Sequence, residues 1–187
     1  EMVKVAKENP LLVQLNQRSM YSPKVTVANE DAYLWLQRDQ GRFDVALVDF
    51  PDPNNFALGK LYTTRFYKLL AQALAPGAPV AVQSTSPLMA RRSFWCVVKT
   101  MEDAGFATRA YHAPVPAFGE WGFVLAREGE LAQPTRLAVD ALQWLSDDVL
   151  VAMFAMGKDM ERVPVEVNRL NNQVLVQYYE AEWRRWN

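Results

Sequence analysis

The hydrophobic positions along the chain form strand-like runs and helix-like stripes, which alternate from residue 43 onward. Residues 43–49 are a nearly continuous apolar run that ends in a carboxylate, and residues 79–83 form a second apolar run. Such runs are typical of strands that are buried on both faces of a parallel sheet. Between them, Thr63 or Thr64 is placed to cap a helix with one apolar face. The pattern predicts a strand, a helix and a strand in that order.

The alternation continues through a second helix and two further strands. Ser86 and Pro87 predict the start of this helix, and Gly105 predicts its end. The two strands follow near residues 107–113 and 121–126, and the short loop between them allows an antiparallel pair at one edge. Strands and helices in this rhythm predict an α/β fold that is Rossmann-like, with a mostly parallel sheet.

The segments on either side of this pattern carry weaker signals. The chain enters helical periodicity at once, without a cap or a preceding turn, so we expect it to begin inside a longer protein. After Arg127 the composition changes, and residues 129–134 are typical of a linker. We expect one domain over residues 1–128 and a helical C-terminal extension over residues 129–187. A helix is predicted over residues 1–8, and residues 10–15 either continue it or form a second short helix. The other predicted elements are helices over residues 32–37, 135–145 and 172–186 and a strand over residues 25–28.

Composition narrows the functional classes. The 187 residues carry a formal net charge of −1 and no cluster of Lys and Arg side chains, which argues against a nucleic-acid partner. Cys96 is the only cysteine and His112 the only histidine, so an internal disulfide, a cysteine-rich metal site and a multi-histidine metal centre are excluded. We expect Cys96 to be a buried small hydrophobe and His112 to be an ordinary strand residue. No apolar stretch approaches the about 18 residues that a membrane span requires.

Polar side chains gather where three of the predicted strands end, at residues 29–31, 49–52 and 83–86. Ligands in open α/β sheets bind beyond the carboxyl ends of the strands. Asp49 and Asp52 are the most informative pair, because two carboxylates at the mouth of a buried strand are costly unless they are paired or used. Their simpler interpretation is turn chemistry, in which each aspartate accepts hydrogen bonds from local N–H groups.

The surroundings of this pair resemble the active-site loop of spermidine synthases and related polyamine aminopropyltransferases. In that family a strand ends in Asp-x-x-Asp-Pro, and a Leu-Tyr pair and a helix that begins with Phe-Tyr follow it. The matching positions are residues 49–53, Leu61-Tyr62 and Phe66-Tyr67. The resemblance covers about residues 1–127, in order, and implies a fold of the methyltransferase type. Its other segments are residues 30–32 (Glu-Asp-Ala), 82–87 (Val-Gln-Ser-Thr-Ser-Pro), 94–95 (Phe-Trp), 105–106 (Gly-Phe), 115–116 (Val-Pro) and 119–123 (Gly-Glu-Trp-Gly-Phe).

This resemblance implies transfer of an aminopropyl group from decarboxylated S-adenosylmethionine, a co-substrate, to an amine such as putrescine, which gives spermidine. The donor is an activated sulfonium that leaves as a neutral thioether, so the reaction requires no metal and no further cofactor. The difficult step is to present an unprotonated amine. An alkylamine titrates near ~10.4, so its deprotonation at pH 7 costs roughly 4–5 kcal/mol. A carboxylate beside the attacking nitrogen accepts that proton.

The family's functional residues carry over to matching positions of this chain. The resemblance implies that Asp49 is the catalytic carboxylate and that Asp52 holds an ammonium group of the amine substrate. It also implies that Asp31 accepts a hydrogen bond from the adenine amino group of the donor. The remaining expected substrate contacts are Tyr62, Gln83 and the aromatic walls Phe118 and Trp121.

This chain departs from the family's pattern in three places. The glycine-rich loop after the family's first strand and the acidic residue after its second strand have no counterpart here, and Phe118 stands where the family has a tyrosine. We therefore expect an N-terminally truncated catalytic domain that is inactive alone, and an acceptor that can differ from putrescine. The extension resembles membrane-anchored spermidine synthase-like proteins at residues 159–160, 166–170 and 178–180. We expect a homo-oligomer in the cytoplasm, at the inner face of the membrane in an anchored parent protein.

Two other functions stay open on the sequence. One is an S-adenosylmethionine-dependent amine methyltransferase, whose Asp/Asn-Pro-Pro-aromatic loop holds a target amine. Residues 49–52 supply a carboxylate where that loop has its aromatic residue, which favours a cationic aliphatic amine over a flat base. The other is a degenerate module that binds polyamines or a partner without catalysis. The presence of both aspartates argues against it.

Overall fold

The computed structural model describes residues 1–39 and 41–184. The chain forms two compact units, the first over Glu1–Asp31 and the second from Ala32 onward. Among the helices of the described residues, none has the length and apolar character that a membrane crossing requires.

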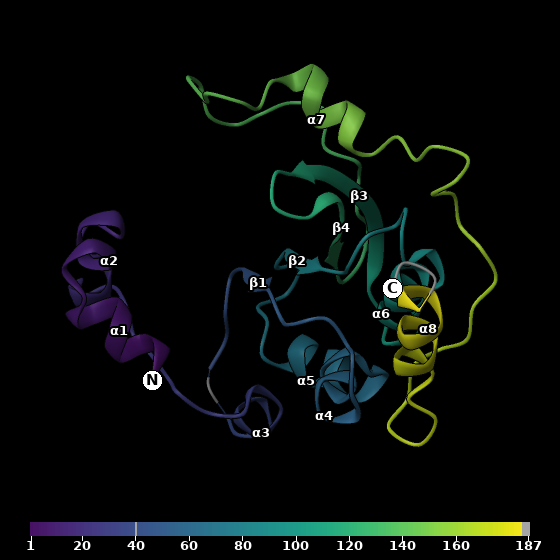
Figure 1. Ribbon diagram of the computed structural model, residues 1–187, viewed down its shortest axis with the longest axis horizontal. Helices are drawn as coiled ribbons and strands as arrows, with labels where there is room; N and C mark the ends of the chain where they lie inside the picture. The colour runs from purple at the N-terminus through teal and green to yellow at the C-terminus, as the bar shows by residue number, and fades with distance from the viewer. Residues whose placement is uncertain (40, 185–187) are drawn as a thin grey trace. The chain divides into compact units, whose positions relative to one another are not determined.

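The first unit consists of two short helices and one 3-10 turn (Figure 1). Asn9 separates α1 (Met2–Glu8) from α2 (Pro10–Leu15), and its side-chain oxygen accepts hydrogen bonds from the backbone of the first turn of α2. Proline at the first helical position suits this start, because the helix needs no N–H donor there. The turn η1 covers Ser19–Tyr21. The helix predicted over residues 1–8 is confirmed, and residues 10–15 form a second helix and not a continuation of the first.

The prediction of a strand over residues 25–28 is wrong. The backbone there is irregular, and Val25 and Val27 are exposed. A strand requires a neighbour to satisfy its N–H and C=O groups. None of the described strands pairs with this segment. A β-branched run therefore did not suffice to make a strand without a partner.

The second unit is built on a four-stranded sheet in the order β1-β2-β4-β3 (Figure 1). The strand β1 (Ala46–Val48) runs parallel to β2 (Val80–Gln83). The strands β3 (Ala107–Val115) and β4 (Gly119–Arg127) form an antiparallel hairpin, and β4 also runs antiparallel to β2. The predicted α/β class and the antiparallel closing pair are confirmed. The sheet was expected to be mostly parallel, but among the described strands it is mixed, because the tight hairpin reverses the chain next to the single parallel pair.

Side chains alternate between the two faces of this sheet, as the period of two in a strand requires. Val80, Val82 and Val124 are completely buried, and they join a core that includes aromatic side chains of two helices. Leu47 points to the other face and is 80% exposed, although its neighbour Val48 is buried. The sheet therefore has one closed face and one open face.

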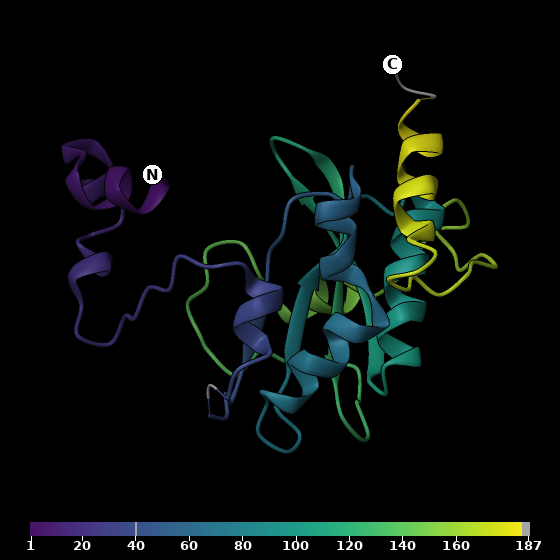
Figure 2. The same cartoon turned by 90° about the horizontal axis from the view of Figure 1, so that it is seen from below.

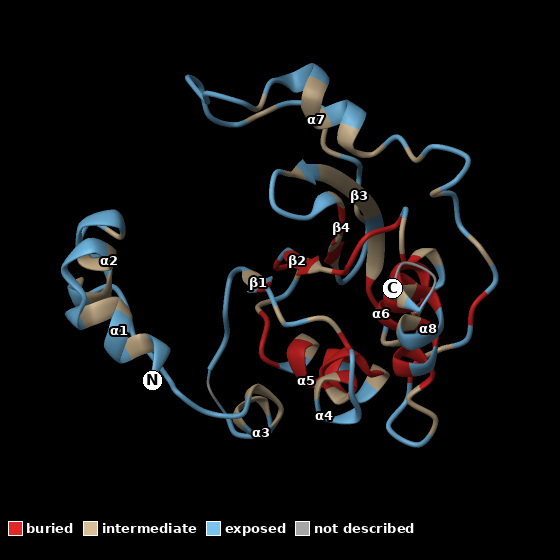
Figure 3. Ribbon diagram, in the orientation of Figure 1, coloured by how far each residue is buried: buried red, intermediate tan, exposed pale blue. Residues whose placement is uncertain are grey.

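The helices α5 and α6 carry most of the buried residues that close the first face (Figure 3). Thr63 caps α5 (Thr64–Gln72), because its hydroxyl accepts a hydrogen bond from the Phe66 N–H. Gly105, with a positive φ, follows the end of α6 (Arg91–Asp103). Both assignments were predicted. The smaller elements nearby are α3 (Ala32–Leu36), α4 (Phe56–Gly59) and the 3-10 turn η2 (Lys60–Tyr62).

Two predicted helix positions require correction. The helix that we expected to open at Ser86 starts instead at Arg91, since the Ser86 hydroxyl first closes a separate turn by accepting from the Met89 N–H. The helix expected over residues 135–145 is absent, and that stretch is irregular and largely exposed.

A short helix follows that irregular stretch, and it lies beside β3 (Figures 1 and 2). This helix, α7, covers Asp147–Met153. Ser146 caps it through a hydrogen bond from the Val149 N–H, and two aspartates occupy its first turn. The helix α7 therefore begins directly after its capping residue, Ser146.

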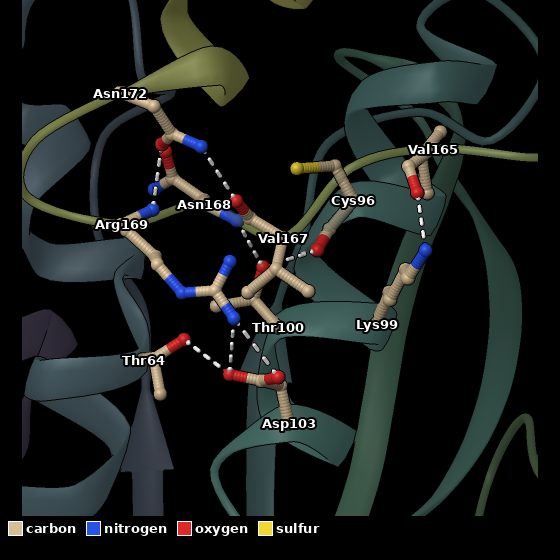
Figure 4. A network of polar contacts seen from close by, with 10 residues as sticks. All are labelled: Thr64, Cys96, Lys99, Thr100, Asp103, Val165, Val167, Asn168, Arg169 and Asn172. Carbon is tan, nitrogen blue, oxygen red and sulfur yellow. Dashed lines mark hydrogen bonds and ion pairs between the residues drawn. The ribbon is translucent and has the colours of Figure 1, made fainter.

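The last helix, α8 (Val174–Trp183), lies within the predicted range, of which residues 185 and 186 fall outside the described residues. The segment before it is fastened to α6 by polar contacts (Figure 4). The Asn168 N–H donates to the Thr100 hydroxyl at 2.9 Å, and the Asn168 amide donates to the carbonyls of Gly59 and Tyr62 at 3.1 Å. Residues 165–178 thereby contribute side chains to the same core as the sheet. The domain boundary expected after residue 128 stays a prediction.

Candidate active site

The loop after β1 carries the two aspartates that the sequence singled out. Val48 is buried in the core, so the strand is fixed up to the residue before Asp49. Beneath the loop, the Tyr62 hydroxyl donates toward the carbonyls of Phe50 and Pro51, at 3.2 and 3.0 Å. Burial, together with the negative charges of the aspartates, raises the pKa of Tyr62. Its hydroxyl therefore stays a donor and holds the loop in place.

Asp52 lies in a less solvated place than Asp49. Its Oδ2 accepts a hydrogen bond from the Tyr179 hydroxyl of α8 at 2.8 Å. Desolvation raises the pKa of Asp52, and hydrogen bonding to Tyr179, Thr85 and Gln83 opposes that rise. Burial therefore disfavours the ionised form of Asp52, and the polar neighbours favour that form.

The turn after β2 approaches the same place. Thr85 has φ +62°, which is an unusual conformation for a β-branched residue and is typical of strained sites. Its carbonyl accepts a hydrogen bond from the Gly122 N–H at 2.7 Å. A Cβ at residue 122 would lie 2.5 Å from the Phe94 ring and 2.7 Å from that carbonyl, so only glycine allows the approach. The turn and β4 are thereby held in close contact.

Gln83 joins the loop after β1 to the hairpin. With its amide oriented to satisfy both neighbours, the nitrogen donates to the Phe50 carbonyl at 3.1 Å and the oxygen accepts from the Trp121 indole N–H. Trp121 is buried, and its ring lies 5.2 Å from the ring of Phe118, which is 62% exposed. Gln83 therefore orients an aromatic wall as well as the loop.

These segments enclose a cavity of about 1060 Å³ at the carboxyl ends of β1 and β2. It continues along the open face of the sheet, where Leu47, Ala81 and Phe123 line it. Asp49 and Asp52 are the charged side chains among the described residues that line it. The rest of the lining is mainly apolar and rich in aromatic rings. Its remaining lining residues are Val48, Phe50, Pro51, Gln83, Met89, Tyr111, Val115, Ala117, Phe118, Trp121, Tyr179 and Trp183.

The structure brings most of the predicted site residues together. Asp49, Asp52, Gln83, Phe118 and Trp121 all line this cavity. Tyr62 lies under the loop and is 1% exposed, and its role as a substrate contact stays a prediction. Asp31 is exposed and belongs to the first unit, so its contact with adenine also stays a prediction. Within the described residues, no three His, Cys, Asp or Glu side chains gather as metal ligands would.

Sequence reasoning missed three residues of this site. Tyr179 and Trp183 reach the cavity from α8, and Tyr111 reaches it from β3. The spacing of the aromatic residues in the last helix is typical of a buried core face or a docking surface. That interpretation suits Tyr178, which is buried against α6, but it does not suit Tyr179, whose ring is turned toward the cavity. Packing decides which face of a helix contacts its neighbours. The sequence pattern alone therefore does not distinguish buried Tyr178 from Tyr179, which lines the cavity.

Comparison with known proteins identifies the family of the chain. Residues 1–136 match the model of the spermine/spermidine synthase domain. Polyamine aminopropyltransferase 2 of Ralstonia nicotianae is 51% identical over 174 residues, which cover 92% of this chain and 34% of the relative. The polyamine aminopropyltransferase of Leptospira interrogans is 48% identical over 178 residues, which cover 95% of this chain and 36% of the relative.

The fold agrees with these matches. The crystal structure of spermidine synthase from Thermotoga maritima superposes with a TM-score of 0.67 at 20% identity, over 84% of this chain and 56% of that one. The chain spans about a third of the length of the curated relatives it matches. By the domain match and the identities to those relatives, the chain belongs to the spermine/spermidine synthase family.

Proposed function

We propose that this chain forms the amine-acceptor side of a polyamine aminopropyltransferase, which moves an aminopropyl group from decarboxylated S-adenosylmethionine to a diamine such as putrescine. One observation carries the proposal. The cavity at the end of β1 holds two carboxylates and no described basic side chain, and aromatic rings line its walls. A cationic aliphatic chain is the ligand class that fits this combination, because carboxylates bind its ammonium groups and rings cover its methylenes.

The proposed chemistry is a direct displacement. The lone pair of the acceptor nitrogen attacks the carbon next to the sulfonium sulfur. The carbon–sulfur bond breaks, and its electron pair stays on sulfur as a neutral thioether. Asp49 takes the proton that the attacking nitrogen loses, because it follows a fixed strand and faces the cavity. Asp52 holds the second ammonium group, which leaves the first one beside Asp49.

The other residues serve substrate binding in this proposal. Trp121 and Phe118 cover the methylene chain, and Gln83 fixes the indole of Trp121 as well as the loop. Tyr62 supports the loop from below. Asp31 is proposed to accept from the adenine amino group of the donor. Homo-oligomer formation, a cytoplasmic location and a membrane anchor in a longer protein stay predictions.

The proposal is tested by identifying the product. A chain of full family length that carries this sequence is incubated with putrescine and either decarboxylated S-adenosylmethionine or S-adenosylmethionine, and the products are analysed by mass spectrometry. We expect spermidine and the nucleoside thioether from the decarboxylated donor alone. A methylated amine from S-adenosylmethionine would show a methyltransferase instead. Binding of putrescine without any product would show a module that has no catalytic role.

A further inference from the structure

The α8 helix brings one polar group directly onto the carboxylate of Asp52. The Tyr179 hydroxyl donates to Asp52 Oδ2 at 2.8 Å. The other oxygen, Oδ1, is buried and has no hydrogen-bond partner among the described residues. Among the polar neighbours of this carboxyl group, Tyr179 makes the well-defined hydrogen bond, so the orientation of Asp52 depends on Tyr179 more than on Thr85 or Gln83.

The position of α8 is fixed by a second carboxylate. Glu182, one helical turn after Tyr179, is buried at the N-terminus of α6. Its oxygens accept from the N–H groups of Arg92 and Ser93 and from the Ser93 hydroxyl, at 2.7 to 3.0 Å. A carboxylate that accepts unsatisfied N–H groups at a helix start is a strong anchor. Beside Tyr179, the ring of Trp183 lies 5.7 Å away and also lines the cavity. Tyr179 is thus held at this place by its own helix.

We propose that Tyr179 is a positioning residue for the acceptor amine: its hydroxyl orients Asp52 toward the second ammonium group of a diamine, and its ring, with that of Trp183, closes the cavity over the methylenes. The inference rests on the proposed role of Asp52. It assigns a binding task to the C-terminal helix, which lies outside residues 1–136 of the family match.

Two physical effects support this assignment. Burial raises the pKa of Asp52, and the hydrogen bond from Tyr179 opposes that rise, so the hydroxyl helps to keep the carboxylate ionised for an ammonium group. The same contact and burial raise the pKa of Tyr179, which therefore remains a donor. A phenol ring beside a carboxylate also gives an alkylammonium a face for cation–π contact.

The test compares Tyr179→Phe with Tyr178→Phe in a chain of full family length. Each substitution removes one hydroxyl and keeps the ring. Tyr178 is the matched control because its hydroxyl accepts from the Glu166 N–H and its ring lies under the Arg92 guanidinium, away from the cavity. We expect Tyr179→Phe to raise the KM for putrescine about tenfold, as the loss of one hydrogen bond to a charged group does. The KM for the donor should stay unchanged.

A double-mutant cycle separates positioning from packing. If Tyr179 acts through Asp52, then Tyr179→Phe has no further effect on the putrescine KM in an Asp52→Asn background. If the role of Tyr179 is only structural, Tyr179→Phe raises the putrescine KM by the same factor in the wild-type and Asp52→Asn backgrounds. This result would overturn the inference. An unchanged putrescine KM in Tyr179→Phe, or an equal rise in Tyr178→Phe, would also overturn it.

Calorimetric titration with putrescine distinguishes a failure of this inference from a failure of the proposed function. If the wild-type chain forms no spermidine, the proposed function fails. The titration still decides the inference, because it requires no turnover. A dissociation constant for putrescine that rises about tenfold in Tyr179→Phe alone supports the role of Tyr179, and equal constants for the wild type and Tyr179→Phe refute it.

Discussion

Asp52 shows how a single residue connects stability with binding. Desolvation raises its pKa above the ordinary value of 3.8, so the folded chain favours the protonated acid more than the unfolded chain does. Ionisation of this group therefore opposes folding. The penalty is absent below pH 3.8, grows as the pH rises through the raised folded value, and is constant above it. In the proposed function, an ammonium group bound at Asp52 would compensate for that penalty.

Replacement of Asp52 by Asn should consequently stabilise the empty protein at neutral pH. We expect the Tm of Asp52→Asn to exceed that of the wild type at pH 7, and the difference to vanish near pH 3. Thermal unfolding followed by circular dichroism at both pH values measures this. Asp44→Asn is the control, since Asp44 is exposed and lies outside the cavity lining. A lower Tm for Asp52→Asn at pH 7 would show that burial does not dominate at this carboxyl group.

The same substitution should weaken the binding of amines that carry two charges. If Asp52 holds the second ammonium group, Asp52→Asn raises the KM for diamines by about 10- to 100-fold, the range for a hydrogen bond to a charged group. The KM of a monoamine of equal chain length should change little, because it has no second ammonium group. Steady-state kinetics with putrescine and butylamine make the comparison. An equal rise in the KM for both amines would show that Asp52 is only a turn residue.

At the scale of elements, α8 is attached to the rest of the second unit by the contacts of Glu182. We expect Glu182→Gln to lower the free energy of unfolding by about 2 kcal/mol, because an amide nitrogen would face N–H donors where a carboxylate oxygen now accepts. Glu180→Gln is the matched control on the same helix, since Glu180 is exposed and pairs with Arg184 at 3.7 Å. That pair should contribute less than about 0.5 kcal/mol.

Urea unfolding of the two variants decides this prediction. Similar losses in Glu182→Gln and Glu180→Gln would mean that the contacts at the start of α6 do not anchor α8. If the prediction holds, Glu182→Gln should also raise the putrescine KM, because α8 carries Tyr179.

The sequence predicted the elements well where local chemistry and burial agree. Thr63 before α5 and Gly105 after α6 mark helix ends that the structure confirms. Cys96 is buried as expected, and His112 lies in β3 as expected. The predictions failed where local pattern had no tertiary partner, as in residues 25–28 and 135–145, which are irregular.

The site was predictable from the sequence to the extent that its residues follow strands. Asp49 and Asp52 follow β1, and Gln83 ends β2, so the rule for carboxyl ends of strands led to three residues that line one cavity. The rule fails for residues 29–31, because the strand expected before them is absent. The contribution of Tyr179, which lies 127 residues after Asp52 in the chain, depends on how α8 docks. That docking is set by Glu182 and Asn168, two buried polar residues whose hydrogen-bond partners lie far away in the sequence.

At the scale of the whole molecule, four separate segments build one acidic, aromatic cavity. The loop after β1 supplies the carboxylates, the end of β2 supplies Gln83, the β3–β4 hairpin supplies Trp121, and α8 supplies Tyr179. The same cavity runs onto the open face of the sheet, past Leu47. Its charge and shape fit an amine acceptor whose nitrogen loses a proton to Asp49.

The most direct test of this account is the turnover number of Asp49→Asn in a chain of full family length, with decarboxylated S-adenosylmethionine and putrescine both saturating. The amide keeps the shape of the side chain and cannot accept the proton. We predict that kcat falls by about 10²- to 10⁴-fold, the usual contribution of a general base, while the KM for the donor stays within about twofold. Asp44→Asn, which changes an exposed carboxylate outside the cavity, should keep the wild-type kcat. A wild-type kcat in Asp49→Asn would contradict the account.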